Sequence, residues 1–381
     1  MRTADIERLS RPYADDTDQP LAEPALELGV EIPKWKQLEL AVLEDLSTQA
    51  PYGIAWWAPH PGTSRRILIS DQLYACTRSV LDNMVESALH LLEALDWSDR
   101  ESDRLANVVS VENGKLVVKM PRPQNPLEAL GNQMVRLHVA GTVRALAGAL
   151  DCMAGTIIGV LALPTSILKA DFGVLRSLLK KVVATASTEG ERVQAIFGAK
   201  FEGLISSVGP EGWLEWALAF RNMLVHRGRR IELGQFVQRT PVLYGPEGQP
   251  VLRARRVTHL PRDPGRSDVE VFLDASSTPL LTESDDQTLY GLIESTKSFV
   301  EGIGQELGEV WNWRRTHPDS LPQPKRQWPD GPSTESTGFS GYAPGSFKYS
   351  PSMMTTHPVV FKRMRASALD DEARSRWKTF D

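Results

Sequence analysis

The sequence VAGTVRALAGALDCMAGTIIGV, from Val139 to Val160, decides how this chain folds. Its glycines at 141, 148 and 155 recur every seven residues, and Gly159 follows. A heptad repeat places these positions on one side of an α-helix, although each glycine costs roughly 1 kcal/mol of helix propensity relative to alanine. The close approach of a second helix would offset that cost. We favour a partner helix in the same chain over a second copy across a two-fold axis.

The same region bears on where the protein resides. The uncharged run from Cys152 to Leu168 has 17 residues, somewhat fewer than the roughly 20 that a membrane helix needs, and we interpret it as a buried helix. The amino terminus, MRTADIERLS, lacks the apolar run of a secretory signal. Cys76 and Cys152 lie in apolar segments and indicate neither a disulfide framework nor a cysteine metal site. We expect a cytoplasmic protein with no membrane association.

Apolar residues at helical spacing continue on both sides of this segment. Thr188 and Glu191 have the pattern of a capping box. The periodicity predicts helices that begin at Asp71, run from Asn125 towards Leu163, and cover 166–186, 188–208, 211–227 and 283–314. We expect these helices to pack as an antiparallel bundle.

Two short segments interrupt the helical pattern. Asn113 and Gly114 tolerate the positive φ angles of a type I′ turn, which predicts a β-hairpin within about 104–121. Strand-like sequence predicts a second β insertion at 230–274, with a last strand from Val269 to Leu273. The expected fold class is therefore mainly α: an antiparallel helix bundle with two small β insertions and a disordered C-terminal tail.

Composition divides the chain into three parts. Residues 1–70 are expected to form an acidic arm that packs partly on the body, because the first 50 residues hold five basic and eleven acidic side chains but Trp35, Trp56 and Trp57 need cover. Residues 71–315 form the helical domain. Residues 316–381 form a tail rich in proline, serine and glycine, in which 367–378 could fold into a short helix.

Several enzyme classes lose support from the sequence. It has no G-x-x-x-x-G-K-[ST] phosphate loop, no H-E-x-x-H, no C-x-x-C and no G-x-S-x-G, so ATPase, zinc-protease and esterase functions are disfavoured. We expect no cofactor and no metal. The net charge of -5 argues against attraction of the whole chain to nucleic acid. Any nucleic-acid site must therefore depend on a local excess of positive charge.

The segment FRNMLVHRG, residues 220–228, stands at the carboxyl end of an apolar helix. On a regular helix, Asn222 and His226 lie about 100° and 140° around the axis from Arg221, whereas Leu224 lies at about 300°. Three polar groups therefore share one side of a rigid helix. In this arrangement the segment resembles the HEPN superfamily, helical domains marked by an arginine, a polar residue and a histidine four to six residues after the arginine.

The resemblance covers the helical context of 71–315 and this one short motif, in a chain that is larger than a minimal member of the family. It implies a metal-independent endoribonuclease that acts as a homodimer, with both copies of Arg221, Asn222 and His226 lining one cleft. The chemistry is coherent, because RNA is cut by its own 2′-hydroxyl once a base removes that proton and an acid protonates the leaving 5′-oxygen. Histidine can take either role near neutral pH, and arginine binds phosphate through two hydrogen bonds.

Local charge favours an RNA partner. Residues 221–256 contain eight arginines and two glutamates. We predict that RNA is bound by Arg227, Arg229, Arg230, Arg253, Arg255 and Arg256. The alternative is an arginine-rich solvated hairpin that pairs with the acidic arm.

A cytoplasmic ribonuclease would damage its own cell unless it is restrained, so a toxin or antiviral role with an antitoxin or regulatory partner protein is expected by analogy. The other hypothesis for the chain is a catalytically silent HEPN-like binding or scaffold protein.

Overall fold

A computed structural model describes residues 28–45, 63–106, 109–112, 115–118, 126–226, 234–240, 253–266, 270, 273–274, 280–321 and 342. These residues are mainly helical, which confirms the predicted class at that level. The helices are α3 (Pro33–Asp45), α4 (Thr63–Ala106), α5 (Pro126–Val160), η1 (Ile167–Lys169), α6 (Phe172–Thr185), α7 (Glu189–Ser207), α8 (Trp213–His226) and α10 (Asp285–Thr316). The strands are β1 (Val109–Glu112), β2 (Lys115–Val118), β3 (Gly234–Thr240) and β4 (Arg253–His259).

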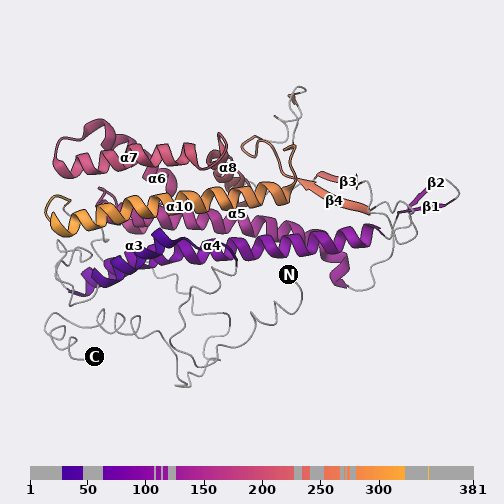
Figure 1. The fold of residues 1–381 in the computed structure, drawn as a ribbon, viewed down its shortest axis with the longest axis horizontal. Coiled ribbons are helices and arrows are strands. Elements are labelled where there is room, and N and C mark those ends of the chain that lie inside the picture. Colours follow the sequence, from indigo (N-terminus) through magenta and orange to yellow (C-terminus); the bar gives the residue numbers. More distant parts are fainter. Residues whose placement is uncertain are drawn as a thin grey trace, which may run out of the picture.

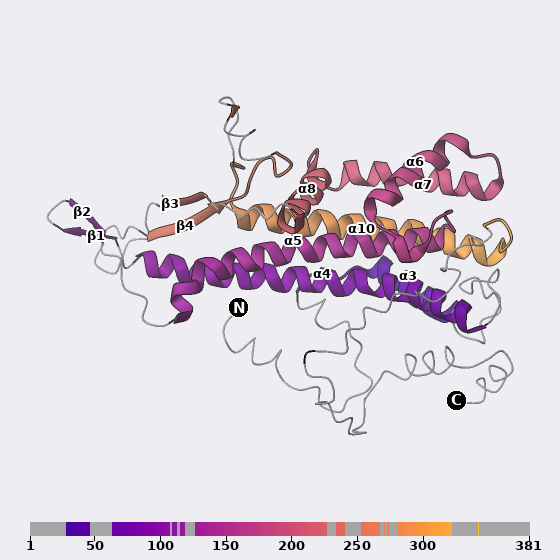
Figure 2. The same ribbon diagram turned by 180° about the vertical axis from the view of Figure 1, so that it is seen from behind.

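Helices α4 and α5 lie side by side in opposite directions along the length of the molecule (Figures 1 and 2). The glycines of α5 face side chains of α4: a Cβ atom on Gly141, Gly148, Gly155 or Gly159 would lie 2.6 to 2.8 Å from His90, Asn83, Cys76 or Leu73, respectively. Cβ atoms essentially never lie so close to another heavy atom, so a side chain at any of these positions would force the facing residue of α4 to move. The expectation that the glycines admit a helix of the same chain is confirmed.

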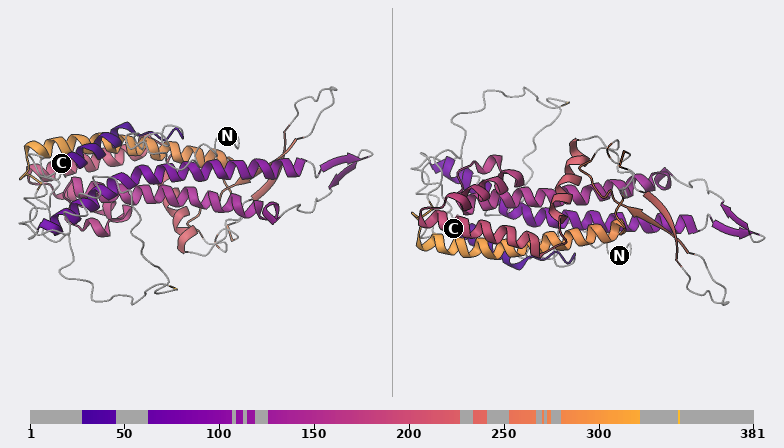
Figure 3. Two further views of the ribbon diagram at one scale, coloured as in Figure 1. Left: turned by 90° about the horizontal axis from the view of Figure 1, so that it is seen from below. Right: turned by 90° about the horizontal axis from the view of Figure 1, so that it is seen from above.

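Helix α10 closes this pair by contacting α3, α4, α5 and α7 (Figure 3). An aromatic cluster joins it to the second half of the bundle. The Phe299 ring of α10 lies 6.4 Å from Phe172, 5.4 Å from Phe201 and 6.2 Å from Trp213, measured between ring centres. Helices α6, α7 and α8 are thus fixed on α10 by one continuous core, and α8 is held beside α5.

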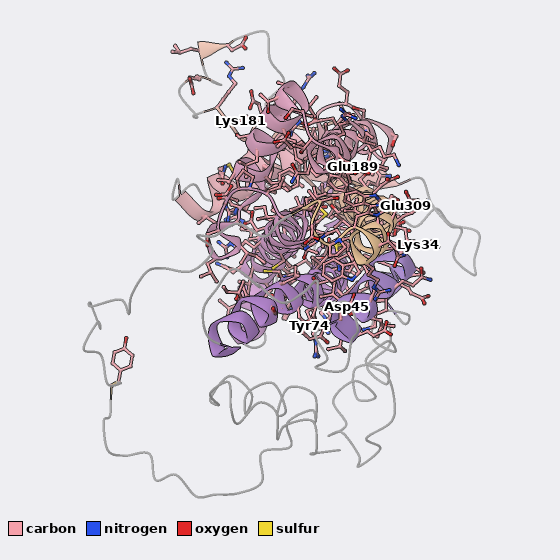
Figure 4. All side chains as sticks on the ribbon, turned by 90° about the vertical axis from the view of Figure 1, so that its left-hand side faces the viewer. Lys34, Asp45, Tyr74, Lys181, Glu189 and Glu309 are labelled. Carbon is pink, nitrogen blue, oxygen red and sulfur yellow. The ribbon has the colours of Figure 1, made fainter. Side chains whose placement is uncertain are left out.

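Helix α3 forms from residues that the sequence assigns to the acidic arm. Trp35 is fully buried, as its size predicts, and its indole N–H donates to the Thr77 carbonyl at 2.7 Å. At the end of α3, the buried Asp45 accepts hydrogen bonds from Trp311 Nε1 at 2.7 Å and from Arg315 Nε at 2.8 Å. Figure 4 shows Asp45, Lys34 and Tyr74 on neighbouring helices at this end of the molecule. Trp56 and Trp57 lie outside the described residues.

Two helix starts differ from the prediction. Helix α4 begins at Thr63 rather than at Asp71, and Ser70 is buried within it. The helix predicted over 166–186 is divided into η1 and α6, because the Asp171 side chain accepts from the Val174 N–H at 2.7 Å and starts a new helix.

The capping box of α7 is confirmed: Thr188 Oγ1 accepts from the Glu191 N–H at 3.2 Å, and Glu191 accepts from the Thr188 N–H at 3.0 Å. The hydrogen bonds from the backbone of Thr188 and from Ser187 lower the pKa of Glu191 to about 2.

The strands form two antiparallel pairs, β1 with β2 and β3 with β4. Asn113 and Gly114 stand between the first two. The strand predicted from Val269 to Leu273 is wrong, because Glu270 and Leu273 have helical backbones. Residues 1–27 of the arm and, apart from Tyr342, residues 322–381 of the tail lie outside the described residues, as does the helix expected at 367–378.

One helix among the described residues, Leu130–Val160 of α5, is long and apolar enough to cross a membrane. However, 78% of its most apolar window is buried inside the protein. Such burial is typical of the core helix of a soluble protein.

Candidate active site

Helix α8 carries the Arg221 motif, and its amphipathic sequence fixes which side meets the bundle. Trp213, Leu214, Ala217, Phe220 and Met223 are all buried against the core. The helix follows Gly212, whose φ of +79° belongs to the left-handed region that glycine tolerates best. The opposite side of the helix faces solvent and includes the exposed Asn222.

Arg221 lies at the edge between these two sides, and its side chain is 35% exposed. Its Nη1 donates to Asn222 Oδ1 at 3.1 Å, and its Nη2 contacts Asp151 Oδ2 of α5 at 3.4 Å. The structure therefore brings the first two residues of the predicted site together. It also adds an acidic neighbour that the prediction did not include.

Asp151 links three helices through one carboxylate. Its Oδ2 faces Arg221 of α8, and its Oδ1 accepts from the N–H of Phe172, the first residue of α6, at 3.1 Å. Asp151 was not among the predicted site residues. The sequence does contain one indication of its importance: Asp151 is the only charged residue between Arg144 and Lys169, and a buried charge needs a partner.

Burial dominates the electrostatics of Asp151. Its pKa is raised above the ordinary aspartate value, chiefly by desolvation, although the Phe172 N–H and the Arg221 guanidinium act in the opposite direction. The neighbouring Asp171 adds to the increase. The contact at 3.4 Å with a partly exposed guanidinium is thus a weak ion pair. This contact orients the Arg221 side chain, but the guanidinium remains partly exposed to solvent.

His226 is the last residue of α8, and the structure describes its backbone alone. On the helix, position 226 lies about 40° around the axis from Asn222, which is on the solvent-facing side. The end of the helix is fixed close by, since Arg144 Nη2 of α5 donates to the Leu224 carbonyl at 3.3 Å. Whether the imidazole meets Arg221 and Asn222 stays a prediction.

The predicted RNA-binding arginines fall into two groups. Arg227, Arg229 and Arg230 lie outside the described residues. Arg253, Arg255 and Arg256 lie on β4, opposite Thr240, Gln238 and Val237 of β3. The end of this strand pair is tied to α8, where Trp216 Nε1 donates to the Pro261 carbonyl at 3.0 Å.

Metal ligands are not grouped in the part of the chain whose side chains are described: no cluster of three or more His, Cys, Asp or Glu residues there could hold an ion. The groups available near Arg221 are a guanidinium, an amide and a carboxylate. Such groups can bind an anion and orient a neighbouring imidazole.

No family model, curated protein or solved structure matches this chain. The HEPN resemblance therefore depends on the motif of α8 and its helical surroundings.

Proposed function

We propose that this protein is a HEPN-type endoribonuclease that cleaves RNA without a metal ion. The observation that carries the proposal is the contact between Arg221 and Asn222 on the solvent-facing end of α8, four residues before His226 along the same helix. A guanidinium that is partly exposed and already oriented can receive a phosphate at low entropic cost. The amide beside it supplies a second polar group at the same place.

In the proposed reaction, one His226 removes the proton of the RNA 2′-hydroxyl, and the resulting oxygen attacks the adjacent phosphorus. The bond from phosphorus to the 5′-oxygen breaks, and a second His226, from the other protomer, protonates that leaving oxygen. The products are a 2′,3′-cyclic phosphate and a 5′-hydroxyl. Arg221 opposes the charge that gathers on the phosphate in the transition state, and Asn222 orients either the imidazole or a phosphate oxygen.

The proposal extends to the fold of the chain and to its assembly as a pair. The helices form a HEPN-like antiparallel bundle with two β insertions, and two chains pair so that both motifs line one cleft. Arg227, Arg229, Arg230, Arg253, Arg255 and Arg256 bind the RNA backbone. The local excess of arginine over glutamate in residues 221–256 supports this assignment.

The biological role that we propose is a cytoplasmic toxin or antiviral effector, restrained by an antitoxin or regulatory partner protein. An unrestrained ribonuclease harms its own cell, so this role follows by analogy with other proteins of this type.

The test is RNA cleavage in EDTA by the full chain and by Arg221→Ala, Asn222→Ala and His226→Ala. Each of the Arg221 and His226 variants should lose at least about 100-fold in rate, the lower range for a positioned acid–base group, and the wild-type product should end in a 2′,3′-cyclic phosphate. Arg192→Ala is the matched control, because Arg192 is an exposed arginine on α7. Cleavage that survives in the Arg221 and His226 variants would contradict the proposal.

A second candidate function is a catalytically silent HEPN-like scaffold. The contact between Arg221 and Asp151 favours it, because a guanidinium that binds a carboxylate of its own chain is less available to RNA. Equal inertness of wild type and variants on several RNAs, with unchanged folding, would support the scaffold.

A further inference from the structure

A cavity of about 630 Å³ lies beside the first half of α8, nearer the start of the helix than Arg221. Glu215, Trp216 and Ala219 line it, and these positions lie about 120°, 220° and 160° around the helix axis from Arg221. Its other walls come from the start of α10 and from the segment that follows β4; these elements meet in Figure 2. The volume falls within the range of roughly 300 to 1,000 Å³ that is usual for small-molecule sites.

Two tryptophans form an aromatic wall of the cavity, and both of their indole N–H groups are already hydrogen-bonded within the protein. Trp213 Nε1 donates to the Ile205 carbonyl and Trp216 Nε1 to the Pro261 carbonyl, each at 3.0 Å. Packing also fixes both rings: Trp213 stands edge-on to Phe299, and Trp216 lies 5.0 Å from Phe220 between ring centres. A ligand therefore meets the carbon surface of these indoles and not their N–H groups.

The charged side chains around the wall are predominantly acidic. They are Glu211, Glu215, Asp263 and Glu283, against the one guanidinium of Arg262.

Two positive contributions act against these carboxylates. Arg176 forms an ion pair with Glu215 at 2.8 Å, and α8 and α10 both begin beside the cavity, each with about half a positive charge at its first turn. Because Arg176 also pairs with Glu202 at 2.9 Å, its charge only partly offsets Glu215, and the lining stays predominantly acidic. An anionic ligand such as a phosphate is disfavoured here.

We propose that this cavity binds a small organic cation with an apolar body. The cationic group would lie against the electron-rich indole surface, an arrangement that recognises alkylammonium and guanidinium groups. Asp263 and Glu283 would supply the complementary charge from the two segments that flank the tryptophans. The inference is independent of the proposed nuclease activity, because neither Arg221 nor Asn222 lines the cavity.

Calorimetric titration of the full chain tests this assignment with matched probes. Choline and agmatine present a quaternary ammonium and a guanidinium, and 3,3-dimethylbutan-1-ol is a neutral analogue of choline with nearly the same shape. We expect at least one cation to bind at millimolar concentration or below, about tenfold more tightly than the neutral alcohol. Added salt should weaken binding.

Two variants locate the site. The double substitution Asp263→Asn with Glu283→Gln keeps the shape of the cavity and should weaken cation binding about tenfold, and Trp216→Leu should weaken it by a similar factor. Glu309→Gln, at the far end of α10, removes an exposed carboxylate outside the cavity and should leave binding unchanged.

Three results would overturn the proposal: equal affinity for choline and the alcohol, cation binding that is unchanged in the Asp263/Glu283 variant, or no binding of either cation at millimolar concentration. The Asp263/Glu283 variant should keep the thermal stability of the wild type, so loss of folding is distinguished from loss of the site.

Discussion

Two arginines contact helix α5, and their surroundings differ. Arg314 of α10 is 2% exposed, and its Nη1 donates to the carbonyls of Gly159 and Val160 at 3.2 and 2.8 Å, where α5 ends. Arg221 of α8 contacts Asp151, nine residues before the end of α5, and keeps 35% of its side chain exposed. The Arg314 guanidinium is enclosed by the core, whereas the Arg221 guanidinium lies at the boundary between the core and solvent.

The difference separates a structural arginine from one that can act on a ligand. Burial lowers the pKa of Arg314 to about 10, and Asp45 opposes that change, so the side chain remains charged at neutral pH. Its charge lies at the carboxyl end of a helix, where a cation is favourable, and faces the Trp311 ring at 5.3 Å. No phosphate could reach it without opening the core. Arg221 needs no such opening.

The largest effect is expected from Arg314→Met. The substitution keeps an apolar stem of similar length but removes the guanidinium that donates to the Gly159 and Val160 carbonyls, of which Gly159 still accepts from the Ala162 N–H at 3.3 Å. We expect the free energy of unfolding to fall by about 3 kcal/mol, measured by urea denaturation. Arg192→Met is the control on an exposed arginine of α7 and should change it by less than about 0.5 kcal/mol. A loss below about 1 kcal/mol for Arg314→Met would show that its charge is not needed there.

The turn beside Arg314 offers a gain in stability. Ala162 has a φ of 51°, and the turn closes when the Leu163 N–H donates to the Ile158 carbonyl at 3.0 Å. This pattern ends many helices, and glycine is preferred in the left-handed position. Ala162→Gly should raise the free energy of unfolding by about 1 kcal/mol, whereas Ala199→Gly, on an exposed position inside α7, should lower it by about 1 kcal/mol. Destabilisation by Ala162→Gly would contradict the strain at this turn.

These contacts also explain how much of the fold the sequence could predict. The glycine heptad of α5 predicted close helix packing because only one physical cause, another helix, readily offsets the cost of so many glycines. The capping box of α7 was predictable because both of its partners are four residues or fewer apart. The buried Arg314 was not, since its partners at Gly159 and Val160 are distant in the sequence and a charged residue suggests an exposed position.

The candidate site divides in the same way. Arg221 and Asn222 are adjacent on one helix, so their contact follows from local geometry. Asp151 comes from another helix and depends on how α5 and α8 pack, which no local pattern encodes. The assignment of residues 33–45 to the acidic arm followed mean charge, whereas α3 is held by one apolar side that buries Trp35 and Leu38.

A smaller effect on stability is expected from Arg221→Ala. Partly exposed ion pairs contribute little, so the free energy of unfolding should fall by less than about 1 kcal/mol, while RNA cleavage is lost under the proposed function. Asp151→Asn is the informative companion, because it retains an acceptor for the Phe172 N–H but removes the charge that orients Arg221. It should lower cleavage partially without abolishing it. A loss of stability for Arg221→Ala as large as that for Arg314→Met would remove the distinction between the two arginines.

The smallest expected effect concerns a third contact of α5, between His138 and His90 of α4, whose Nδ1 atoms lie 3.0 Å apart. One ring must donate and the other accept, which requires at least one neutral imidazole. Burial, and then His90, lower the pKa of His138, and Glu93 opposes this; Glu86 faces the other nitrogen of His90 at 3.8 Å.

Because the pKa of His138 is lower in the folded chain, the unfolded chain binds more protons in acid. The contribution of His138 to the free energy of unfolding is therefore complete above its pKa in the unfolded chain, about 6.5. It is lost as the pH falls through the lower pKa of His138 in the folded chain. Urea midpoints measured from pH 8 to pH 5 should decline less in His138→Asn than in wild type, and His317→Asn, on the exposed end of α10, should follow wild type. Parallel profiles for wild type and His138→Asn would show that solvent, rather than the helix pair, sets the protonation of this histidine.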